Sequence, residues 1–570
     1  MQWRSHGGAA LPSLPRSVLG APAGQGDPIE SVPNDTTRGR SRSWDLAFLV
    51  LVLLHLVPIW TVRYPPSCDG PAHLESAHAL LQRTSADHPL YRKFLVLRRD
   101  PSVNWFPTLA LAGLMLVAKP VIALKLFLTG YLLLLPYALR YALVAIHRRA
   151  GWLALLSLPL LFNTLFLRGF LSFHYGLAIL LFTLGYWLRV QDVGLAETWR
   201  LTGCALALQF THMFALAGAC VILAALGVAQ AWACRRRGRR AVLRLLACRL
   251  LAPLFAFLPA LTLAAVYLLP RLEVGPALDV ATADRLLALP LTGYGDRREA
   301  WLAAGLVASL AVVAALVAAQ ALRRRRFLPA DGLILALGFW LGLWLVAPER
   351  LAGGSFLAER AALCFFLTLV LWCASRPLAP ALRTSGSAVV LALTLGLLAA
   401  HVAKAHEVSR QVERFLRAAS RVPSGSALLS LGAPASGTPS RLPFLEHAAS
   451  YAAVARRGLN LTNYQFAADH FPFAFRERLQ PGRWLGLPLD ARAHDVVGLF
   501  EDRGGLVDAV LLWTPTEEAP PCLHAILERS PFVAHHAAAP GEPDVFVRAV
   551  PRLPAVPLAD LRLGPTARDR

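Results

Sequence analysis

The sequence predicts an α-helical polytopic membrane protein with about 11 transmembrane helices and a C-terminal extracytoplasmic α/β domain. Hydrophobic residues make up 56% of the 570 positions. They lie in long stretches with few charges, as in lipid-facing helices. The formal net charge is +22, and much of the excess stands in short arginine clusters between apolar stretches, such as 235–240 and 323–326. Such clusters are typical of cytoplasmic loops, so the charge does not indicate nucleic-acid binding.

The first 43 residues are rich in Gly, Pro, Ser and Arg and contain no apolar core. This composition predicts a disordered basic cytoplasmic tail (1–43) and not a signal peptide, so the first span has to direct membrane insertion. A transmembrane domain then covers 44–403, and an extracytoplasmic α/β domain covers 404–570.

The spans are predicted from apolar stretches, because a helix needs roughly 20 apolar residues to cross the hydrocarbon core. They lie at about 44–62, 106–118, 121–146, 152–167, 171–189, 201–233, 246–269, 301–321, 329–347, 361–375 and 387–403. The long stretch 201–233 is either one tilted span or a span with a re-entrant piece.

The arginine clusters predict the orientation. If 234–245 and 323–326 are cytoplasmic, the N-terminus is inside and the chain after about 404 is outside. The loops 63–105 and 270–300 are then external. The short loop His147-Arg148-Arg149 falls on the external side and is the main violation of the positive-inside rule.

The C-terminal region changes in composition. Short apolar runs at 426–431 and 508–513, a helix-like segment at 522–529 and a final strand at 544–550 alternate with turn-rich stretches. This pattern predicts a small α/β domain. The eight cysteines show no CxxC and no metal-binding spacing. Cys68 and Cys522 are both external in this topology, and a disulfide between them is one alternative.

The segment Tyr64–His78 follows the first span directly and carries the most informative polar residues. Asp69 precedes Gly-Pro and suits a helix N-cap, and His73 lies four residues on, on the same helix face. Glu75 and His78 form a second pair, three residues apart. One interpretation is a capped amphipathic helix on the membrane surface. The other is a carboxylate with a nearby imidazole, which suits a general base or part of a divalent-cation site.

A first span followed by a large external loop, with an Asp near the membrane and a short amphipathic helix, resembles the GT-C superfamily of membrane glycosyltransferases. The resemblance covers most of 44–403 as a pattern of spans and loops. The stretches 168–176, 210–213 and 348–360 also look similar to uncharacterised bacterial members. The resemblance implies transfer of a sugar from a polyprenyl-phosphate carrier on the external face, with Asp69 as the catalytic or metal-binding group. The loop holds one Asp and no Asp-Asp or Asp-Glu pair, which leaves a metal requirement open.

The third of these stretches contains a diglycine at 353–354 that permits a tight turn. Arg350 and Arg360 flank it, and a guanidinium binds phosphate with a planar fork. A lipid-linked phosphate would present its charge at this depth. The alternative is that both arginines reach toward the interface or pair with Glu349 and Glu359.

Two histidines, His174 and His212, lie within or at the edge of apolar spans, where ionisable groups are costly and often functional. The alternative is a neutral imidazole that bonds to a neighbouring helix. Arg168 falls at the cytoplasmic end of its predicted span, where positive-inside anchoring explains it.

These observations predict a glycosyltransferase of the cytoplasmic (inner) membrane that acts on an envelope glycan, lipid or protein acceptor at the external face. Its partners are a polyprenyl-phosphate-linked sugar and membrane lipid, with no nucleic acid. A divalent cation at Asp69 is the only cofactor that the sequence leaves open. The alternatives are a transporter or flippase of a lipid-linked or anionic solute, and a non-catalytic envelope-assembly scaffold. The predicted catalytic residues are Asp69 and His73, and the predicted substrate-binding residues are Glu75, His78, His174, His212, Arg350 and Arg360.

Overall fold

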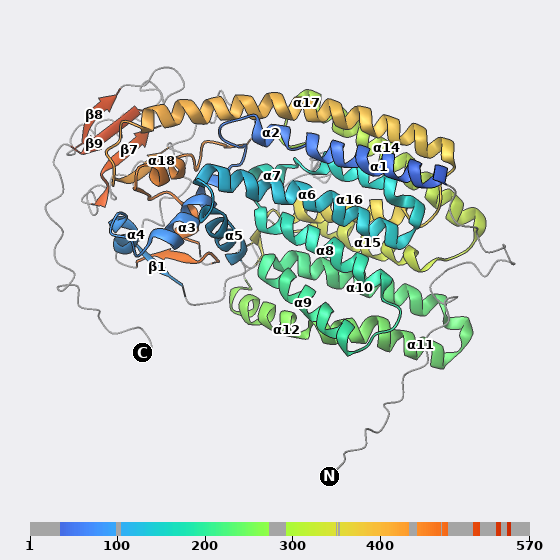
Figure 1. The fold of residues 1–570 in the computed structure, drawn as a ribbon. Coiled ribbons are helices and arrows are strands. Elements are labelled where there is room, and N and C mark those ends of the chain that lie inside the picture. Colours follow the sequence, from blue (N-terminus) through green and yellow to red (C-terminus); the bar gives the residue numbers. More distant parts are fainter. Residues whose placement is uncertain are drawn as a thin grey trace, which may run out of the picture.

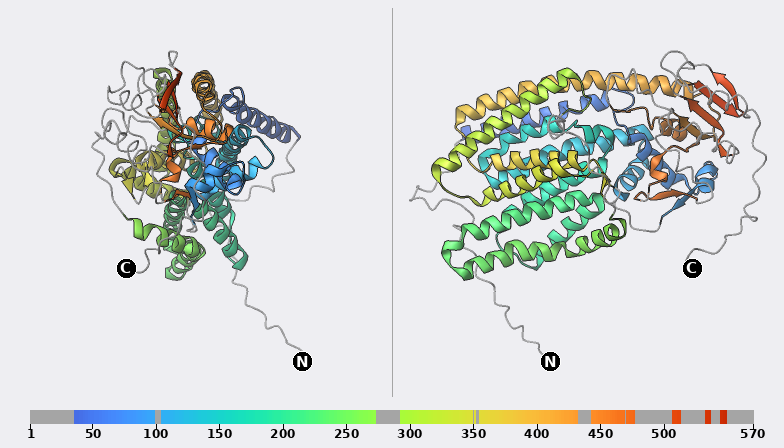
Figure 2. Two further views of the ribbon diagram at one scale, coloured as in Figure 1. Left: turned by 90° about the vertical axis from the view of Figure 1, so that its left-hand side faces the viewer. Right: turned by 180° about the vertical axis from the view of Figure 1, so that it is seen from behind.

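Long helices lie side by side in one bundle, and most of the strands gather at one end of it (Figures 1 and 2). The computed structural model describes residues 35–98, 104–272, 292–348, 350–351, 354–431, 442–468, 470–476, 506–512, 532–536 and 544–548. The predicted helix at 522–529, Cys522 and most of the predicted loop 270–300 lie outside these ranges.

Seven of the described stretches are long and apolar enough to cross a membrane. They are α6 (Pro120–Ile146), α8 (Leu171–Arg189), α10 (Met213–Ala233), Arg239–Arg271 with α11 (Arg239–Leu246) and α12 (Ala252–Leu268), α14 (Arg297–Arg324), Pro329–Val346 with α15 (Leu333–Val346), and α17 (Pro380–Ala419). Large apolar side chains stand exposed on α12 and α14, among them Phe255 at 70% and Trp301 at 70%. Such side chains would face water in a soluble protein and face lipid here.

Shorter apolar elements complete the bundle. They are α1 (Asp35–Leu54), α2 (Val57–Trp60), the 3₁₀ helix η2 (Arg148–Leu160), α7 (Thr164–Arg168), α9 (Leu195–Thr211) and α16 (Leu357–Cys373). A 3₁₀ helix rises about 2.0 Å per residue, so η2 extends roughly 26 Å with few residues. The span predicted at 152–167 is therefore built from η2 and α7, and α7 ends at Gly169 with a left-handed φ of 99°.

The predicted span at 106–118 is corrected by the structure. Helix α5 (Trp105–Met115) has 11 residues, about 16 Å, and cannot cross a hydrocarbon core of about 30 Å. It packs against α3 (Gly70–Gln82), a helix of the loop that follows the first span. The apolar composition of α5 reflects this contact with protein.

The predicted stretch 201–233 is neither one tilted span nor a span with a re-entrant piece. It is the end of α9 and the whole of α10, which meet at His212, where the backbone is extended (φ −165°, ψ 117°). The additional crossing helix in this stretch compensates for α5, which does not cross. The loop His147-Arg148-Arg149 therefore lies at the opposite end of the bundle from the one predicted, beside Arg376 and Arg383.

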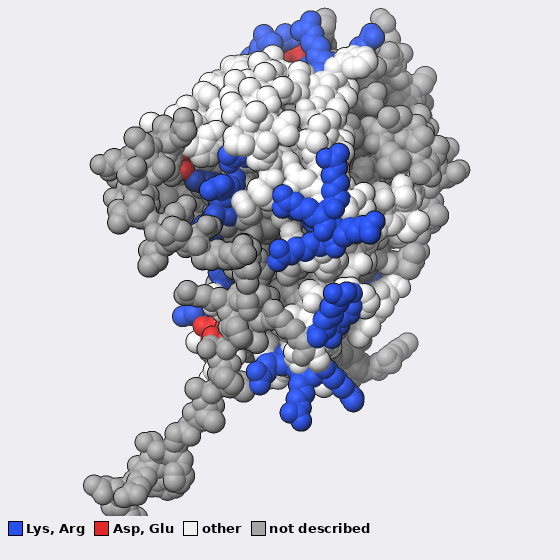
Figure 3. Space-filling model, turned by 90° about the vertical axis from the view of Figure 1, so that its right-hand side faces the viewer, with Lys and Arg blue, Asp and Glu red and all other residues white. Residues whose placement is uncertain are grey.

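Many of the exposed arginines gather at the end of the bundle that lies farthest from the strands. Figure 3 looks onto this end and shows clusters of Lys and Arg with few acidic residues. Exposed members include Arg148, Arg149, Arg235, Arg236, Arg239, Arg240 and Arg323 to Arg326. The violation of the positive-inside rule at 147–149 therefore disappears, because this loop joins the other basic loops.

A five-stranded sheet has the order β5-β4-β7-β9-β8. The strands are β4 (Ala427–Leu431), β5 (Leu459–Asn460), β7 (Ala509–Leu512), β8 (Phe532–His536) and β9 (Asp544–Arg548). Strand β4 is parallel to β5 and β7, and β9 is antiparallel to β7 and β8. Strands therefore form at the two predicted apolar runs and at the predicted final strand. Helix α18 (Ala449–Ala455) lies between β4 and β5.

The loop after the first span and the C-terminal region form one body. Strand β1 (Leu95–Leu97), which follows α4 (Pro89–Phe94), pairs antiparallel with β6 (Phe473–Phe475). A separate apolar cluster joins α4 and β1 to β4 and β7. The forty-residue helix α17 leads from the basic end of the bundle to this body (Figure 1).

Candidate functional site

Asp69 lies where α3 begins, beside the end of α7. Its backbone N–H donates to the carbonyl of Arg168 at 3.0 Å, and the N–H of Cys68 donates to Leu167 at 2.8 Å. The side chain of Asp69 makes no capping hydrogen bond to α3. Asp69 therefore stands at the predicted N-cap position of α3, but its side chain does not cap the helix, and its carboxylate is left for other partners.

The partners of the Asp69 carboxylate come from the C-terminal region. The hydroxyl of Tyr464 donates to Oδ2 at 3.0 Å, and Nε2 of His447 lies 3.5 Å from Oδ1. The rings of His447 and Tyr464 pack together, with centroids 5.0 Å apart. The carboxylate keeps 20% of its side-chain surface exposed, so it is sheltered but still accessible. The sequence did not reveal His447 and Tyr464, because hundreds of residues separate them from Asp69.

Burial raises the pKa of Asp69 from 3.8 to about 6. His447 and the Tyr464 hydroxyl act against burial, as does Arg168, whereas Glu446 raises the pKa further. A carboxylate with a pKa of about 6 is mostly ionised at neutral pH and accepts a proton more readily than an ordinary aspartate.

His73 supports the backbone beside Asp69. It lies one turn along α3, is 4% exposed, and its backbone N–H donates to the carbonyl of Asp69 at 3.0 Å. Burial lowers the pKa of His73 to about 4, so the imidazole is neutral at physiological pH. Gly169 also touches Asp69 closely, because a Cβ on Gly169 would lie 2.6 Å from the Cβ of Asp69.

Arg168 also belongs to this site. Its guanidinium lies over the ring of Phe356, 4.5 Å from the centroid, and it acts electrostatically on Asp69. Its buried Nε has no hydrogen-bond partner among the described residues. Arg168 does not lie with the basic loops, as the predicted anchoring role would require, because its carbonyl pairs with Asp69 at the opposite end of the bundle.

Arg360 occupies the next position along the same aromatic surface. It is 7% exposed, and its guanidinium lies 4.9 Å from the ring centroid of Phe170 and 5.7 Å from that of Phe173. Phe170 packs edge-on against Phe356, the ring below Arg168. The aromatic residues Phe356, Phe170 and Phe173 therefore carry both guanidinium groups, and the Nε of Arg360 also lacks a partner within the described ranges.

His174 and His212 flank Phe173, each with ring centroids 5.4 Å from it. His174 is fully buried and bonds through Nδ1 to the carbonyl of Phe170 at 2.8 Å and through Nε2 to Asn163. His212 accepts the N–H of Phe214 through Nδ1 and so caps α10. Both histidines lie near Arg360, and both have local structural bonds.

Glu75 and His78 point away from Asp69. Glu75 is completely buried, and its carboxylate accepts from Ser450 at 2.7 Å, from the N–H of Asn460 at 2.8 Å and from Asn463 at 3.0 Å. Burial raises the pKa of Glu75 to about 7. His78 bonds to the hydroxyl of Tyr91 at 2.9 Å and contacts the ring of His88. These contacts join parts of the protein and leave the predicted substrate-binding roles of Glu75 and His78 without support.

The diglycine loop forms a small hairpin. Strand β2 (Arg350–Leu351) pairs with β3 (Gly354–Ser355), and α16 follows with Arg360 in its first turn. The side chain of Arg350 and residues 352–353 lie outside what the structure describes. Arg360 is therefore the member of the predicted arginine pair that the structure places at the site.

The donor set at Asp69 does not match a metal centre. Within the described ranges there is no group of three or more His, Cys, Asp or Glu side chains that could hold a metal ion. His447 and Glu446 supply the other titratable groups near Asp69, and Tyr464 donates its proton to the carboxylate.

No known family model matches this sequence, and no curated protein matches it. Among solved structures, ArnT from Cupriavidus metallidurans in the apo state is similar, with a TM-score of 0.50 and 12% identity over 89% of this chain and 98% of that chain. The arabinofuranosyltransferase AftD from Mycobacteria is also similar, with a TM-score of 0.41 and 15% identity, covering 90% of this chain and 40% of that chain. The ArnT similarity shows a shared fold, and it confirms the predicted fold class of an α-helical polytopic membrane protein.

Proposed function

We propose that this chain, a helical membrane protein with the GT-C fold, is a glycosyltransferase that takes a sugar from a polyprenyl-phosphate carrier. The observation that carries the proposal is the position of Asp69 next to Arg168, on an aromatic surface that also holds Arg360. A sheltered carboxylate with a raised pKa lies near the Arg168 guanidinium, and the rings of Phe356, Phe170 and Phe173 carry both this guanidinium and that of Arg360. A proton acceptor next to an anion-binding surface is what transfer from a lipid phosphate requires.

In the proposed reaction, the ionised Asp69 accepts the proton of an acceptor hydroxyl as its oxygen attacks the anomeric carbon of the sugar. The bond between this carbon and the phosphate oxygen breaks, and the lipid phosphate leaves with the bonding electrons. Arg168 and Arg360 would stabilise the negative charge that develops on the phosphate. A positioned general base typically contributes 10²–10⁴ in rate.

The C-terminal region contributes to the orientation of the base. The Tyr464 hydroxyl donates a hydrogen bond to Oδ2 of Asp69, and His447 lies near Oδ1. An aspartate that is held by a hydrogen bond on one oxygen presents the other in a fixed direction, which reduces the entropy cost of reaching the reactive geometry. His73 and Gly169 support the same carboxylate through the backbone.

We infer that the basic end of the bundle is cytoplasmic, because Lys and Arg are retained on that side of a membrane. Asp69 and the sheet lie at the other end and would face the extracytoplasmic side of the inner membrane. This position favours a carrier that presents its sugar outside the cytoplasm and an acceptor in the envelope. It also assigns the loop after the first span and the C-terminal region to the same compartment, as their shared sheet requires.

The change Asp69→Asn tests the proposed base. We expect transfer of a labelled sugar from a polyprenyl-phosphate carrier in reconstituted membranes to fall by about 10²–10⁴. The folded protein should become more stable at pH 7, because burial raises the pKa and the ionised form of Asp69 costs stability as the pH rises from about 4 through 6. At pH 4 the two proteins should have similar melting temperatures.

Asp87→Asn is the matched control, since Asp87 lies in the same loop and is 69% exposed. It should leave both transfer and melting temperature unchanged. Full transfer by the Asp69→Asn protein would contradict the role of Asp69 and favour the transporter or scaffold alternatives.

A further inference from the structure

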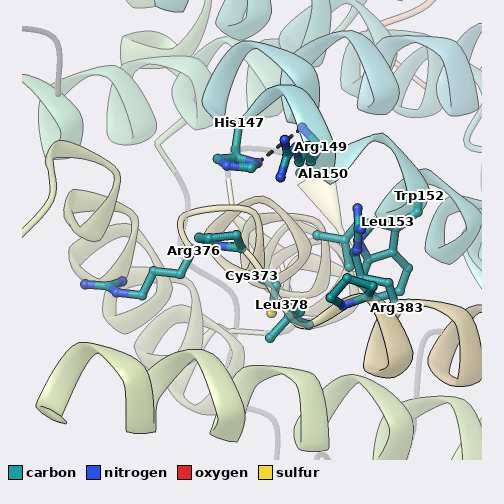
Figure 4. Close-up of a pocket in the computed structure, with 11 residues that line it drawn as sticks. His147, Arg149, Ala150, Trp152, Leu153, Cys373, Arg376, Leu378 and Arg383 are labelled. Atoms are coloured by element: carbon teal, nitrogen blue, oxygen red, sulfur yellow. Dashed lines mark hydrogen bonds between the residues drawn. The ribbon is translucent and has the colours of Figure 1, made fainter. Parts of the chain in front are cut away.

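A cavity of about 70 Å³ opens at the basic end of the bundle, far from Asp69 (Figure 4). It lies where the end of α6, the start of η2, the end of α16 and the start of α17 meet. Its lining residues are His147, Arg149, Ala150, Trp152, Leu153, Cys373, Arg376, Pro377, Leu378, Pro380 and Arg383. One water molecule needs at least about 10–15 Å³ of cavity volume, so this cavity has room for a group of about five heavy atoms.

The charge of the cavity is positive and unbalanced. Its lining contains three arginines and one histidine and lacks an acidic residue. Arg376 is already neutralised, because its guanidinium donates to both oxygens of the buried Asp331 at 2.6 and 2.7 Å. Figure 4 shows Arg376 extended away from Arg149 and Arg383, which approach the cavity from η2 and α17.

Arg383 has unused hydrogen-bonding capacity. Its Nε is buried and has no partner in the part of the chain that the structure describes. Burying a charged donor without a partner is costly, and the cost is recovered when an anion accepts the bond. Trp152 and Leu378 add an apolar wall to the same cavity.

From this geometry we propose that the cavity binds a phosphate anion between Arg149 and Arg383. The phosphate group has five heavy atoms, matches the size of the cavity and accepts the paired donors of a guanidinium fork. Two sources present this chemistry at the membrane surface: the headgroup of an anionic phospholipid and free inorganic phosphate. Basic pockets between helices on the cytoplasmic side are a known means of holding anionic headgroups.

The experiment uses the full chain in nanodiscs of phosphatidylcholine that contain phosphatidylglycerol. Native mass spectrometry after release counts the phosphatidylglycerol molecules that remain bound, and melting temperatures are measured with and without the anionic lipid. Wild-type protein should retain the lipid and melt at a higher temperature in its presence. Arg149→Gln and Arg383→Gln should each weaken retention on the order of tenfold, since each removes a charge-assisted bond.

Arg148→Gln is the matched control. Arg148 is the exposed neighbour of Arg149 and is not part of the cavity lining, so the variant makes the same charge change outside the site. It should retain the lipid as wild type does. A separate titration in phosphatidylcholine alone uses inorganic phosphate, and stabilisation there that depends on Arg149 and Arg383 would identify the free anion as the source.

Equal lipid retention and equal phosphate response in wild type and in the Arg149→Gln/Arg383→Gln double variant would overturn the proposal. If the double variant does not fold, the single variants and the response of wild type to phosphatidylglycerol against phosphatidylcholine decide the outcome. None of these readouts depends on sugar transfer, so the result is independent of the function proposed for Asp69.

Discussion

Gly169 sets the distance between the end of α7 and Asp69. Its φ of 99° is one that residues with a Cβ rarely adopt, and its neighbour Arg168 pairs with the Asp69 backbone. A glycine is needed here for two reasons, the backbone conformation and the close approach of Asp69. The position therefore links local backbone geometry directly to the carboxylate.

We expect Gly169→Ala to reduce sugar transfer by at least about tenfold, because the new Cβ would lie 2.6 Å from the Cβ of Asp69 and must displace it. The left-handed conformation adds a stability cost of about 1–2 kcal/mol. Transfer kinetics and melting temperature measure the two effects. Gly203→Ala, in an exposed position of α9 with open space around it, should leave transfer unchanged and should not lower the melting temperature. Wild-type turnover in Gly169→Ala would show that the site tolerates displacement of Asp69.

Tyr464 should set the acid limit of activity. Its hydrogen bond lowers the pKa of Asp69, so Tyr464→Phe should raise this pKa above about 6. The rising limb of the kcat/KM profile between pH 5 and 7 should then move to higher pH, with the largest relative loss at the acid end of this range.

The matched control is Tyr451→Phe, since the buried Tyr451 hydroxyl has no partner in the described chain and can be removed at little cost. Its profile should overlay that of wild type. An unshifted limb in the Tyr464→Phe protein would argue that Asp69 is not the group whose ionisation controls the rate.

The site could be predicted in part at this scale. Asp69 and His73 lie one turn apart at the start of α3, as their spacing indicated, and Arg360, His174 and His212 gather around Phe173. Glu75 shares the helix with Asp69, but its position turns it toward the C-terminal region. His447 and Tyr464 are brought to Asp69 by tertiary folding alone, and spacing along the chain carries no signal of such a contact.

At the scale of elements, α3 is held to the C-terminal region by buried polar bonds as well as by apolar packing. The Glu75 carboxylate satisfies donors on α18, β5 and the turn after it, and Ser76 donates to Gln465 at 2.7 Å. The contact fixes the helix that begins at Asp69 against the segment that carries Tyr464. A rigid contact here should keep the side chains of Asp69 and Tyr464 in a fixed relative position.

Glu75→Ala should destabilise the protein by about 3 kcal/mol, because it leaves the buried donors of Ser450, Asn460 and Asn463 unsatisfied. Thermal unfolding in detergent measures the loss, and limited proteolysis should show earlier cleavage in the C-terminal region. Glu407→Ala removes a partly exposed glutamate on α17 and should cost less than about 1 kcal/mol. A Glu75→Ala protein as stable as this control would mean that the buried bonds contribute little.

The helices and strands could be predicted where the length of an apolar stretch determines which element forms. The long helices and the strands near 427, 509 and 544 form where the pattern placed them. The error at α5 arises because hydropathy does not distinguish a helix buried in protein from one buried in lipid. The break at His212 could not be predicted because no glycine or proline marks it.

On the scale of the whole molecule, the exposed arginines divide the bundle into a basic end and an end that carries the sheet. Correction of the two errors in the predicted spans removes the exception at 147–149 and makes the charge distribution consistent. The order of the helices between residues 105 and 212 therefore determines which loops face which side.

Reporter fusions test this order. A reporter that is active only outside the cytoplasm should be active after residues 118 and 410 and silent after residues 148 and 240. The fusions at 118 and 148 distinguish the structure from the topology that hydropathy predicts, since an additional span at 106–118 would reverse both. A complementary reporter that is active only in the cytoplasm serves as the control, and the same sign from both reporters at any site would invalidate that fusion.

The contact between Glu75 and Ser450 spans 375 positions of the chain, so the two sides of the site are synthesised at different times. At a synthesis rate of about 5–20 residues per second, the loop with Asp69 is complete roughly 20 to 75 s before its partners leave the ribosome. During this interval the carboxylate lacks Tyr464 and His447, and the edge of the later β1 strand is unpaired. A nascent or truncated chain therefore lacks the assembled site, which forms only when the last long helix and the region beyond it have been made.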